Sequence, residues 1–255
     1  MSEHAPVRVE ARDRLAVLHL TYGANALDGD LLAALEGELE RLDAAGAPPL
    51  VLASAHPTVF CPGLDLRKVD GMPRAQMRAF MGRFNALLRR LVGYPAPTVA
   101  ALAGHAIAGG CLLAATCDRR VMAHWGARIG LSEINLGIPV PAGAVLMLVT
   151  LFPARTVGQL VLEGDGFSGE RALEMGLVER LADPEAVLGE ACELAAHLAS
   201  RPPAAFAAAK QFLRHGLVRE MEERDAAELE RFLDLWYDAG TQDRIASVVA
   251  ALDRR

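Results

Sequence analysis

The residues best suited to chemistry in this 255-residue chain are a glycine pair and one carboxylate that follows it. Gly109-Gly110 opens an apolar run that predicts a buried helix, and Glu133 stands alone among apolar residues about one helix and one strand later. Glycines at a helix start offer backbone N–H groups to an anion. A carboxylate near such donors favours proton transfer beside a stabilised oxyanion. A second carboxylate is expected just after the glycines, but Leu112 stands there. This leaves Glu133 as the single carboxylate for proton transfer.

Each of these features also has an ordinary structural interpretation. A glycine pair alone is typical of close helix packing. A lone glutamate in a loop is usually solvated. The chemical interpretation therefore depends on the surrounding sequence.

Composition excludes several classes of protein. The chain is 52% hydrophobic, which predicts a well-packed core, and its net charge of −6 argues against nucleic acid as a partner. Four cysteines without CxxC spacing are typical of a reducing cytoplasm, and seven histidines without an HxxxH or HxH pair predict no metal site. The first residues lack the apolar stretch of a signal peptide, and the most apolar run, Ala142–Phe152, is too short to span a bilayer. We therefore expect a cytoplasmic protein without a membrane partner.

Hydrophobic periodicity predicts an α/β fold wound as stacked turns, followed by a helical last third. The predicted strands are 7–10, 15–20, 50–54, 98–102, about 120–123, about 128–130 and 177–181, with a loop at 56–68. The predicted helices are 28–45, about 74–91, the run opened by Gly109, 154–163, 169–175, 184–200, 204–215, 218–239 and 242–252. The helix at 218–239 carries an apolar stripe that packs either on its own chain or on a neighbour; its members are Met221, Leu229, Phe232, Leu233, Leu235 and Trp236.

Six short motifs in register extend this interpretation. They are Asn25-Ala26-Leu27, the loop VFCPGLDL at 59–66, GHAIAGG at 104–110, Cys117-Asp118 with Arg120, IGLSEINLG at 129–137, and Arg201-Pro202-Pro203 with Lys210. Together they resemble the crotonase (enoyl-CoA hydratase/isomerase) superfamily over essentially the full length of the chain. Two departures stand out: Ala108 replaces the first glycine of the family's glycine run, and Pro139–Ala144 replaces a glycine-rich segment.

The resemblance implies a crotonase-like spiral of β-β-α turns over residues 1–200. It implies a C-terminal helical region over 201–255 that serves oligomerisation and covers the active site. It also implies a homotrimer or hexamer, and an acyl-CoA thioester as substrate. No separate cofactor is implied, because coenzyme A is part of that substrate.

The same resemblance assigns roles to individual residues. The N–H groups of Leu64 and Gly109 would form an oxyanion hole, and Glu133 would be the base. Substrate-binding positions would be Ala26, Gly63, Asp65, Leu66, Gly110, Leu112 and Lys210. Two of these have plain alternatives: Asp65 as a loop cap, and Lys210 as a solvated helix charge instead of a phosphate contact.

A single carboxylate narrows the expected reaction. Hydratases of the family use two glutamates to hold and activate water, whereas Glu133 alone can take a proton from one carbon and return it to another. The motifs are closest to the single-glutamate enoyl-CoA isomerases, so we expect migration of an enoyl-CoA double bond. The alternatives are a hydratase, another crotonase activity such as decarboxylation or thioester hydrolysis, and a non-catalytic acyl-CoA binder.

Overall fold

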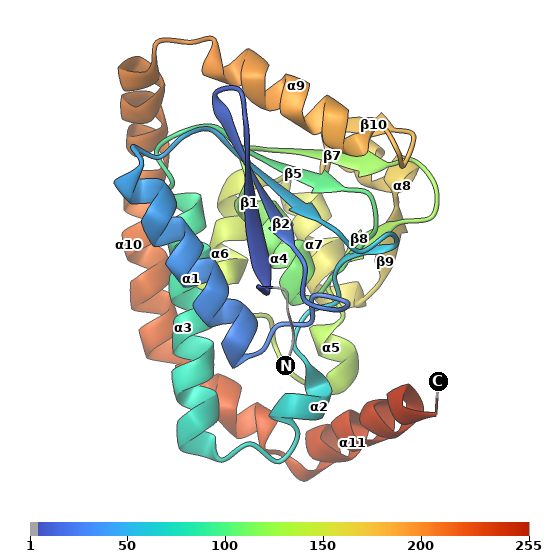
Figure 1. The fold of residues 1–255 in the computed structure, drawn as a ribbon. Coiled ribbons are helices and arrows are strands. Elements are labelled where there is room, and N and C mark those ends of the chain that lie inside the picture. The colour runs from blue at the N-terminus through green and yellow to red at the C-terminus, as the bar shows by residue number, and fades with distance from the viewer. Residues whose placement is uncertain (1–4, 255) are drawn as a thin grey trace.

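The strands of the computed structural model, which describes residues 5–254, form two sheets (Figure 1). The larger sheet has the order β1 (Val7–Arg12), β2 (Leu15–Leu20), β3 (Leu50–Ser54), β5 (Thr98–Leu102), β7 (Arg119–Ala123) and β10 (Arg180–Ala182). The smaller sheet has the order β4 (Val59–Cys61), β6 (His105–Ile107), β8 (Arg128–Gly130) and β9 (Gly166–Ser168). The hairpin β1–β2 is antiparallel, and from β2 to β10 the neighbours in the larger sheet run parallel.

Successive segments of chain repeat one path through the two sheets. β3, β5 and β7 each add a parallel strand to the larger sheet, and β4, β6 and β8 then add one to the smaller sheet. A helix follows each pair of strands, and the chain then returns to the larger sheet. This path confirms the predicted spiral of β-β-α turns.

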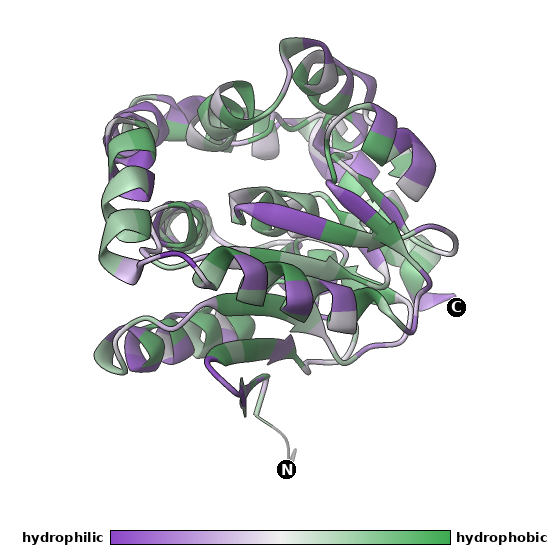
Figure 2. Ribbon diagram, turned by 90° about the horizontal axis from the view of Figure 1, so that it is seen from above, coloured by the Kyte–Doolittle hydropathy of each residue, from purple (hydrophilic) through white to green (hydrophobic). Residues whose placement is uncertain are grey.

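Helices cover the sheets and form the C-terminal region. They are α1 (Gly29–Ala44), α2 (Leu66–Val69), α3 (Arg74–Val92), α4 (Gly109–Thr116), α5 (Glu133–Leu136), α6 (Ala142–Leu151), α7 (Ala154–Glu163), α8 (Gly169–Glu174), α9 (Val187–Ala199), α10 (Pro203–Trp236) and α11 (Ala239–Asp253). α9 lies across the larger sheet, and α10 runs beside α3 and α6 (Figure 1). Figure 2 shows hydrophobic residues concentrated on the strands and on helix faces turned inward. Within residues 5–254, no helix combines the length and apolar character that crossing a membrane requires.

The C-terminal helices differ from the prediction at one place. The sequence predicts separate helices at 204–215 and 218–239, but α10 is continuous over 34 residues. Gly216 lies inside it, where a glycine costs about 1 kcal/mol relative to alanine. Burial of Leu217 and Met221 on the same helix outweighs that cost.

Smaller corrections concern short elements. The strand predicted at 177–181 is β10, which begins at Arg180. The loop predicted at 56–68 contains β4 and the start of α2. The apolar run that begins at Ala142 forms the longer helix α6. Elements of three or four residues offer too few positions for a hydrophobic period to be recognised.

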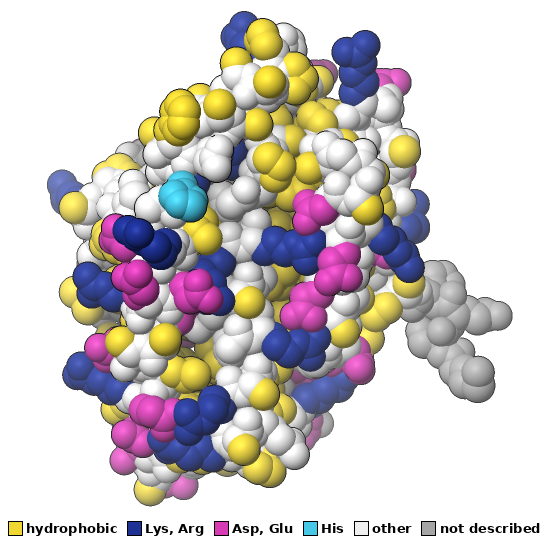
Figure 3. All heavy atoms as spheres, turned by 90° about the vertical axis from the view of Figure 1, so that its left-hand side faces the viewer, with side chains coloured by type: hydrophobic (Ala, Val, Ile, Leu, Met, Phe, Trp, Pro, Cys, Tyr) yellow, Lys and Arg dark blue, Asp and Glu magenta, His cyan; other side chains and the backbone are white. Residues whose placement is uncertain are grey.

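The apolar stripe of α10 packs mainly on its own chain. Met221, Phe232, Leu233 and Trp236 are buried within the chain. Of the two alternatives that the sequence offered, packing on its own chain or on a neighbour, the first therefore holds for most of the stripe. The most exposed large apolar side chains of α10 lie earlier, where Phe212 is 84% and Leu213 is 76% exposed, while Leu235 of the stripe is 39% exposed. Figure 3 shows the side of the molecule at the left of Figure 1, where acidic and basic side chains are interspersed and hydrophobic side chains gather toward the top.

We expect Gly110→Ala to destabilise the protein. A Cβ at Gly110 would lie 2.0 Å from the backbone oxygen of Cys61, so two backbone segments must separate. Overpacking of this kind costs about 1–3 kcal/mol. The matched control is Gly158→Ala in α7, where a Cβ meets nothing within 4 Å and helix propensity favours alanine by about 1 kcal/mol. Urea unfolding of both variants measures the difference, and equal stabilities would contradict this close packing.

Candidate active site

The turn that follows β4 frees one backbone N–H group. Gly63 has φ +95°, a conformation that favours glycine. The Leu27 N–H donates to the Gly63 oxygen at 2.8 Å, and the Asp65 N–H donates to the Leu27 oxygen at 2.9 Å. Leu64 lies between these two bonds, so its own N–H points to the opposite side, away from Leu27. Among residues 5–254, the structure assigns no acceptor to this N–H group.

The start of α4 lies against this turn. A Cβ on Gly109 would be 3.5 Å from the Cα of Gly63, and a Cβ on Gly63 would be 3.2 Å from the Gly109 nitrogen. The first N–H groups of a helix have no partner within the helix, and its dipole adds positive potential there. The Leu64 and Gly109 segments therefore bring two unpaired N–H donors into one small region.

Ala108 stands at the junction of the two segments. Its φ of +51° and ψ of −122° are unusual for a residue with a side chain and store strain of the order of 1–3 kcal/mol. Its Cβ lies 2.8 Å from the position that a Cβ on Gly63 would take, so the facing residue must be glycine. Its N–H donates to the Gly130 oxygen at 2.8 Å, which joins this junction to the end of β8.

That bond explains where Glu133 lies. Ile107 is paired with Gly130 in the smaller sheet, so the residues that follow both strands emerge side by side. Glu133 begins α5 three residues after Gly130, and it is only 8% exposed. The Ser132 N–H donates to Oε2 of Glu133 at 2.9 Å.

Burial dominates the electrostatics of Glu133. It raises the pKa of this carboxyl to about 7, and the N–H groups of Glu133 and Ser132 oppose the rise only in part. None of the described residues that line the surrounding cavity is basic. The carboxyl can therefore gain or lose a proton near neutral pH, as a general base requires.

One cavity joins the donors and the carboxylate. Its lining comes from the β4–α2 turn, α3, the start of α4, the α5–α6 segment and α10; the residues are Pro62, Leu64, Leu66, Met81, Phe84, Ala108, Gly109, Leu112, Ser132, Glu133, Leu136, Ile138, Pro141 and Phe232. Five of the positions predicted from sequence are among them: Leu64, Leu66, Gly109, Leu112 and Glu133. Leu112 is fully buried and adds an apolar wall where a carboxylate would otherwise stand.

Other predicted positions support this cavity without lining it. Gly63 and Gly110 permit close backbone contact, Gly110 against Cys61. Ala26 is half-buried beside Leu27. Asp65 occupies the N-cap position of α2, but its side chain makes no capping hydrogen bond.

Lys210 lies elsewhere in the fold. Its ammonium group is buried, donating to Asp118 Oδ2 at 2.7 Å and to the Ala96 oxygen at 3.0 Å. It is neither a solvated helix charge nor a lining residue of the Glu133 cavity. Its charge pairs with Asp118, and its contact with a coenzyme A phosphate stays a prediction.

Two basic residues lie nearer the predicted substrate loop. Lys68, about half exposed, pairs with Asp28 and donates to the Tyr22 hydroxyl at 2.9 Å. Arg67 pairs with Asp253 at 2.7 Å, which links α2 to α11. The side chains of Lys68 and Arg67 are both about half exposed, close in sequence to the turn that carries Leu64.

Sequence reasoning missed the distant walls of the cavity. Met81 and Phe84 come from α3, and Phe232 comes from α10, about one hundred residues after Glu133. Their only signal in the sequence is an apolar helix face, which is the same for any core residue. Only the packing of α3 and α10 brings them to the site.

A buried carboxylate ties α10 to this region. Asp225 accepts from the Gly143 N–H at 2.9 Å and from Arg89 Nη1 at 3.1 Å. Gly143 lies in the first turn of α6, just after Pro141 of the cavity wall. A Cβ on Gly143 would lie 2.6 Å from the carboxylate oxygens, so glycine permits this contact. Asp225 thus fixes α10 against two of the helices that surround the cavity.

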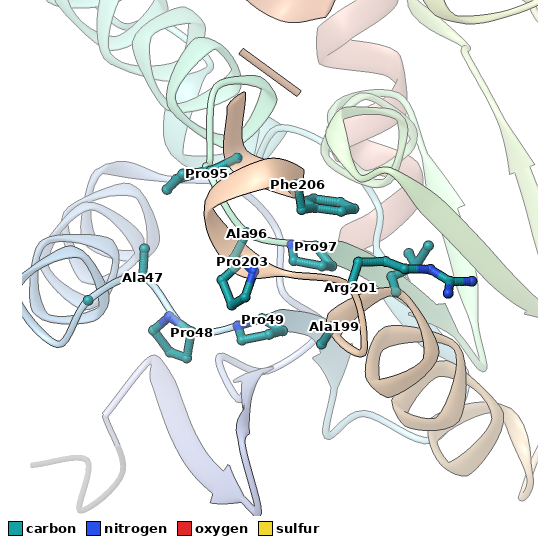
Figure 4. Close-up of a pocket in the computed structure, with 13 residues that line it drawn as sticks. Ala47, Pro48, Pro49, Pro95, Ala96, Pro97, Ala199, Arg201, Pro203 and Phe206 are labelled. Atoms are coloured by element: carbon teal, nitrogen blue, oxygen red, sulfur yellow. The ribbon is translucent and has the colours of Figure 1, made fainter. Parts of the chain in front are cut away.

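A second cavity, of about 280 Å³, lies where α10 begins (Figure 4). Prolines and alanines make up most of its lining, together with Phe206 and Arg201. Arg201 is its one ionisable lining residue, so it offers no acid–base pair. Across residues 5–254, no group of three or more His, Cys, Asp and Glu side chains is arranged to hold a metal ion. The Glu133 cavity is therefore the better candidate for chemistry.

Comparison with known proteins agrees with the fold and the motifs. Residues 11–249 match the family model described as Enoyl-CoA hydratase/isomerase. The chain is 32% identical over 250 residues to the 2,3-dehydroadipyl-CoA hydratase of Escherichia coli, with 97% of this chain and 95% of the relative covered. It is 29% identical over 254 residues to the short-chain-enoyl-CoA hydratase of Clostridium acetobutylicum, with 98% and 95% covered. The structure of human mitochondrial delta3-delta2-enoyl-CoA isomerase superposes with a TM-score of 0.88 at 25% identity, with 98% of each chain covered.

The protein is an acyl-CoA enzyme with the crotonase fold. The chain belongs to the enoyl-CoA hydratase/isomerase family. Its relatives include both hydratases and isomerases.

The raised pKa of Glu133 predicts a pH-dependent stability. The folded-state pKa of about 7 lies above the unfolded value near 4.5, so the folded protein binds more protons between these pH values. The contribution of the Glu133 carboxyl to the free energy of unfolding is fully present below about pH 4.5 and is lost as the pH rises through about 7. Glu133→Gln removes the titration, so its stability relative to wild type should increase by about 2–3 kcal/mol from pH 5 to pH 8. Urea unfolding at both pH values measures this change, and a pH-independent difference would contradict it.

Proposed function

We propose that this protein moves the double bond of a 3-enoyl-CoA to the 2-position. The observation that carries the proposal is one buried carboxylate, Glu133, in a cavity with two unpaired N–H donors and with Leu112 in place of a second carboxylate. In this reaction the thioester oxygen accepts hydrogen bonds from the Leu64 and Gly109 N–H groups. Negative charge develops on that oxygen when a proton leaves C2, so the donors bind the transition state more strongly than the substrate.

Glu133 serves as the single base and then as the acid. Its carboxylate takes the proton from C2, and the electron pair delocalises onto the thioester oxygen as a dienolate. The protonated carboxyl then returns a proton to C4, and the double bond moves from C3–C4 to C2–C3. No atom is gained or lost. A pKa near 7 suits both steps, because neither protonation state is strongly disfavoured near neutral pH.

The apolar lining supports isomerisation over hydration. Water must be held and activated for addition to a double bond, and Leu112 provides no hydrogen bond for it. Hydration is the second candidate function, since two of the relatives that match nearly the whole chain are hydratases by description. In that case Glu133 would orient water without a second carboxylate.

Further aspects of the function are part of the same proposal. We infer that coenzyme A enters as part of the substrate and that no separate cofactor takes part. We infer a cytoplasmic location, in line with four free cysteines. Residues 1–200 would provide the spiral core, and 201–255 would cover the site and support assembly.

Product analysis with wild-type protein tests the reaction. We expect isomerisation of a 3-enoyl-CoA to be at least about tenfold faster than hydration of the matching 2-enoyl-CoA. The physical reason is that Glu133 alone transfers protons better than it positions water. Formation of 3-hydroxyacyl-CoA at a rate equal to or above isomerisation would replace the isomerase proposal with hydratase.

Glu133→Gln tests the role of the base in the same assay. The amide preserves the shape of the side chain but removes the base, so turnover should fall by about 10²–10⁴-fold. Calorimetry with a saturated acyl-CoA should show nearly unchanged binding. Glu163→Gln, at the exposed end of α7, is the matched control and should keep wild-type activity. Near wild-type turnover by Glu133→Gln would rule out the single-base mechanism.

We also propose assembly as a trimer or hexamer. Support comes from the resemblance and from large exposed apolar side chains, including Phe212, Leu213 and Leu162, which is 71% exposed. Light scattering at micromolar concentration should give three or six times the chain mass of 27.2 kDa. A mass of one chain under these conditions would contradict the proposal.

A further inference from the structure

Exposure changes from one end of the Glu133 cavity to the other. Pro62 is exposed, and Leu64, Leu66 and Leu136 are half-buried, so these residues form the mouth. The remaining large apolar lining residues are all buried: Met81, Phe84, Leu112, Ile138, Pro141 and Phe232. The cavity therefore has one open end, beside the turn that carries Leu64, and one closed end.

Helix α10 contributes an aromatic wall to the closed end. The Phe232 ring stacks on Trp236, with centroids 6.1 Å apart and planes 26° apart, and Trp236 is almost fully buried. Space behind Phe232 is therefore filled by a second aromatic side chain. Figure 1 shows α10 running along α3, which supplies Met81. Asp225 anchors α10 to Gly143 and Arg89, so this wall cannot move independently of α6 and α3.

The size of the cavity limits what can enter. Its volume is about 80 Å³. The cavity at the start of α10 has about 280 Å³, so the space beside Glu133 is small by comparison and suits a short acyl chain. The carbons between C2 and C4 already need this space if they are to reach Glu133.

We propose that Phe232, backed by Trp236, closes the acyl cavity and restricts the enzyme to short acyl chains. This inference rests on the proposed function, because it assumes that an acyl-CoA thioester occupies the cavity. A longer chain must displace the Phe232 ring from its buried stack or fold back toward the mouth. Either route weakens binding, since packed interiors resist added volume.

Binding of saturated acyl-CoAs tests the length limit without relying on turnover. Isothermal calorimetry with butyryl-, hexanoyl- and decanoyl-CoA should give a dissociation constant at least about tenfold weaker for decanoyl-CoA than for hexanoyl-CoA. Phe232→Ala removes the closing ring and should reduce this discrimination at least threefold, mainly by strengthening decanoyl-CoA binding. Turnover of 3-enoyl-CoAs of the same lengths should follow the same order.

Phe80→Ala provides a matched control. Phe80 is a phenylalanine of α3 that is 6% exposed, as is Phe232, but it does not line the cavity. Its removal should leave the ratio of decanoyl-CoA to hexanoyl-CoA affinity unchanged. If circular dichroism shows that Phe232→Ala does not fold, Phe232→Leu and Met81→Ala carry the test, with smaller effects in the same direction.

The outcomes separate this inference from the proposed function. Equal affinity of the wild-type protein for butyryl- and decanoyl-CoA overturns the length limit and leaves the proposed isomerase intact. An equal change of the ratio in Phe80→Ala and Phe232→Ala overturns the role of Phe232. Absence of binding at every chain length overturns the proposed function itself.

Discussion

The contact between the Gly63 turn and the start of α4 is the constraint on which the rest of the site depends. Two backbone segments from successive turns of the spiral meet where a side chain on Gly63 or Gly109 would collide with its neighbours. Gly110 against the Cys61 carbonyl extends the same contact by one residue. Backbone N–H groups can converge in this way only because neighbouring turns stack in register, and helix geometry leaves the Gly109 donor unpaired. The anion-binding region is thus a direct product of the fold.

The second constraint is the burial of an unneutralised carboxyl group. Glu133 is carried to the same region by β8, whose last residue is bound to Ala108. Its surroundings are apolar, and its two N–H contacts offset the loss of hydration only in part. A cation in the cavity would have stabilised the charge and lowered the pKa, and a second carboxylate would have held water. The apolar environment instead keeps the pKa of Glu133 near 7, and it lowers the stability of the folded protein when the carboxyl is ionised.

The C-terminal helices belong to the site as much as to the periphery. α10 packs beside α3 and α6, and the Asp225 carboxylate fixes it to both. Through this anchoring, Phe232 becomes part of the wall that faces Glu133. The same helix carries Lys210, whose ammonium group pairs with Asp118 outside the Glu133 cavity. Helix α10 therefore contributes Phe232 to the cavity wall and, separately, Lys210 to an ion pair with Asp118.

The sequence by itself determined the features that depend on short segments of chain. Glycine at 63, 109 and 110, the isolated Glu133 and the repeated strand and helix patterns could be read directly, because each reflects a local backbone requirement or a hydrophobic period. The close contact between the Gly63 and Gly109 segments could be expected only from the resemblance to the crotonase superfamily.

Only the tertiary structure decided which distant residues complete the site. Phe84 and Phe232 look like any core residue in the sequence, and their place in the cavity depends on how α3 and α10 pack. The partner of Lys210 was equally unreadable, since Asp118 lies 92 positions away. Helix α10 continues through Gly216 because burial of its neighbours outweighs a local preference. Long-range packing determines these features, and side chains that only fill space carry no local signal of where they will be used.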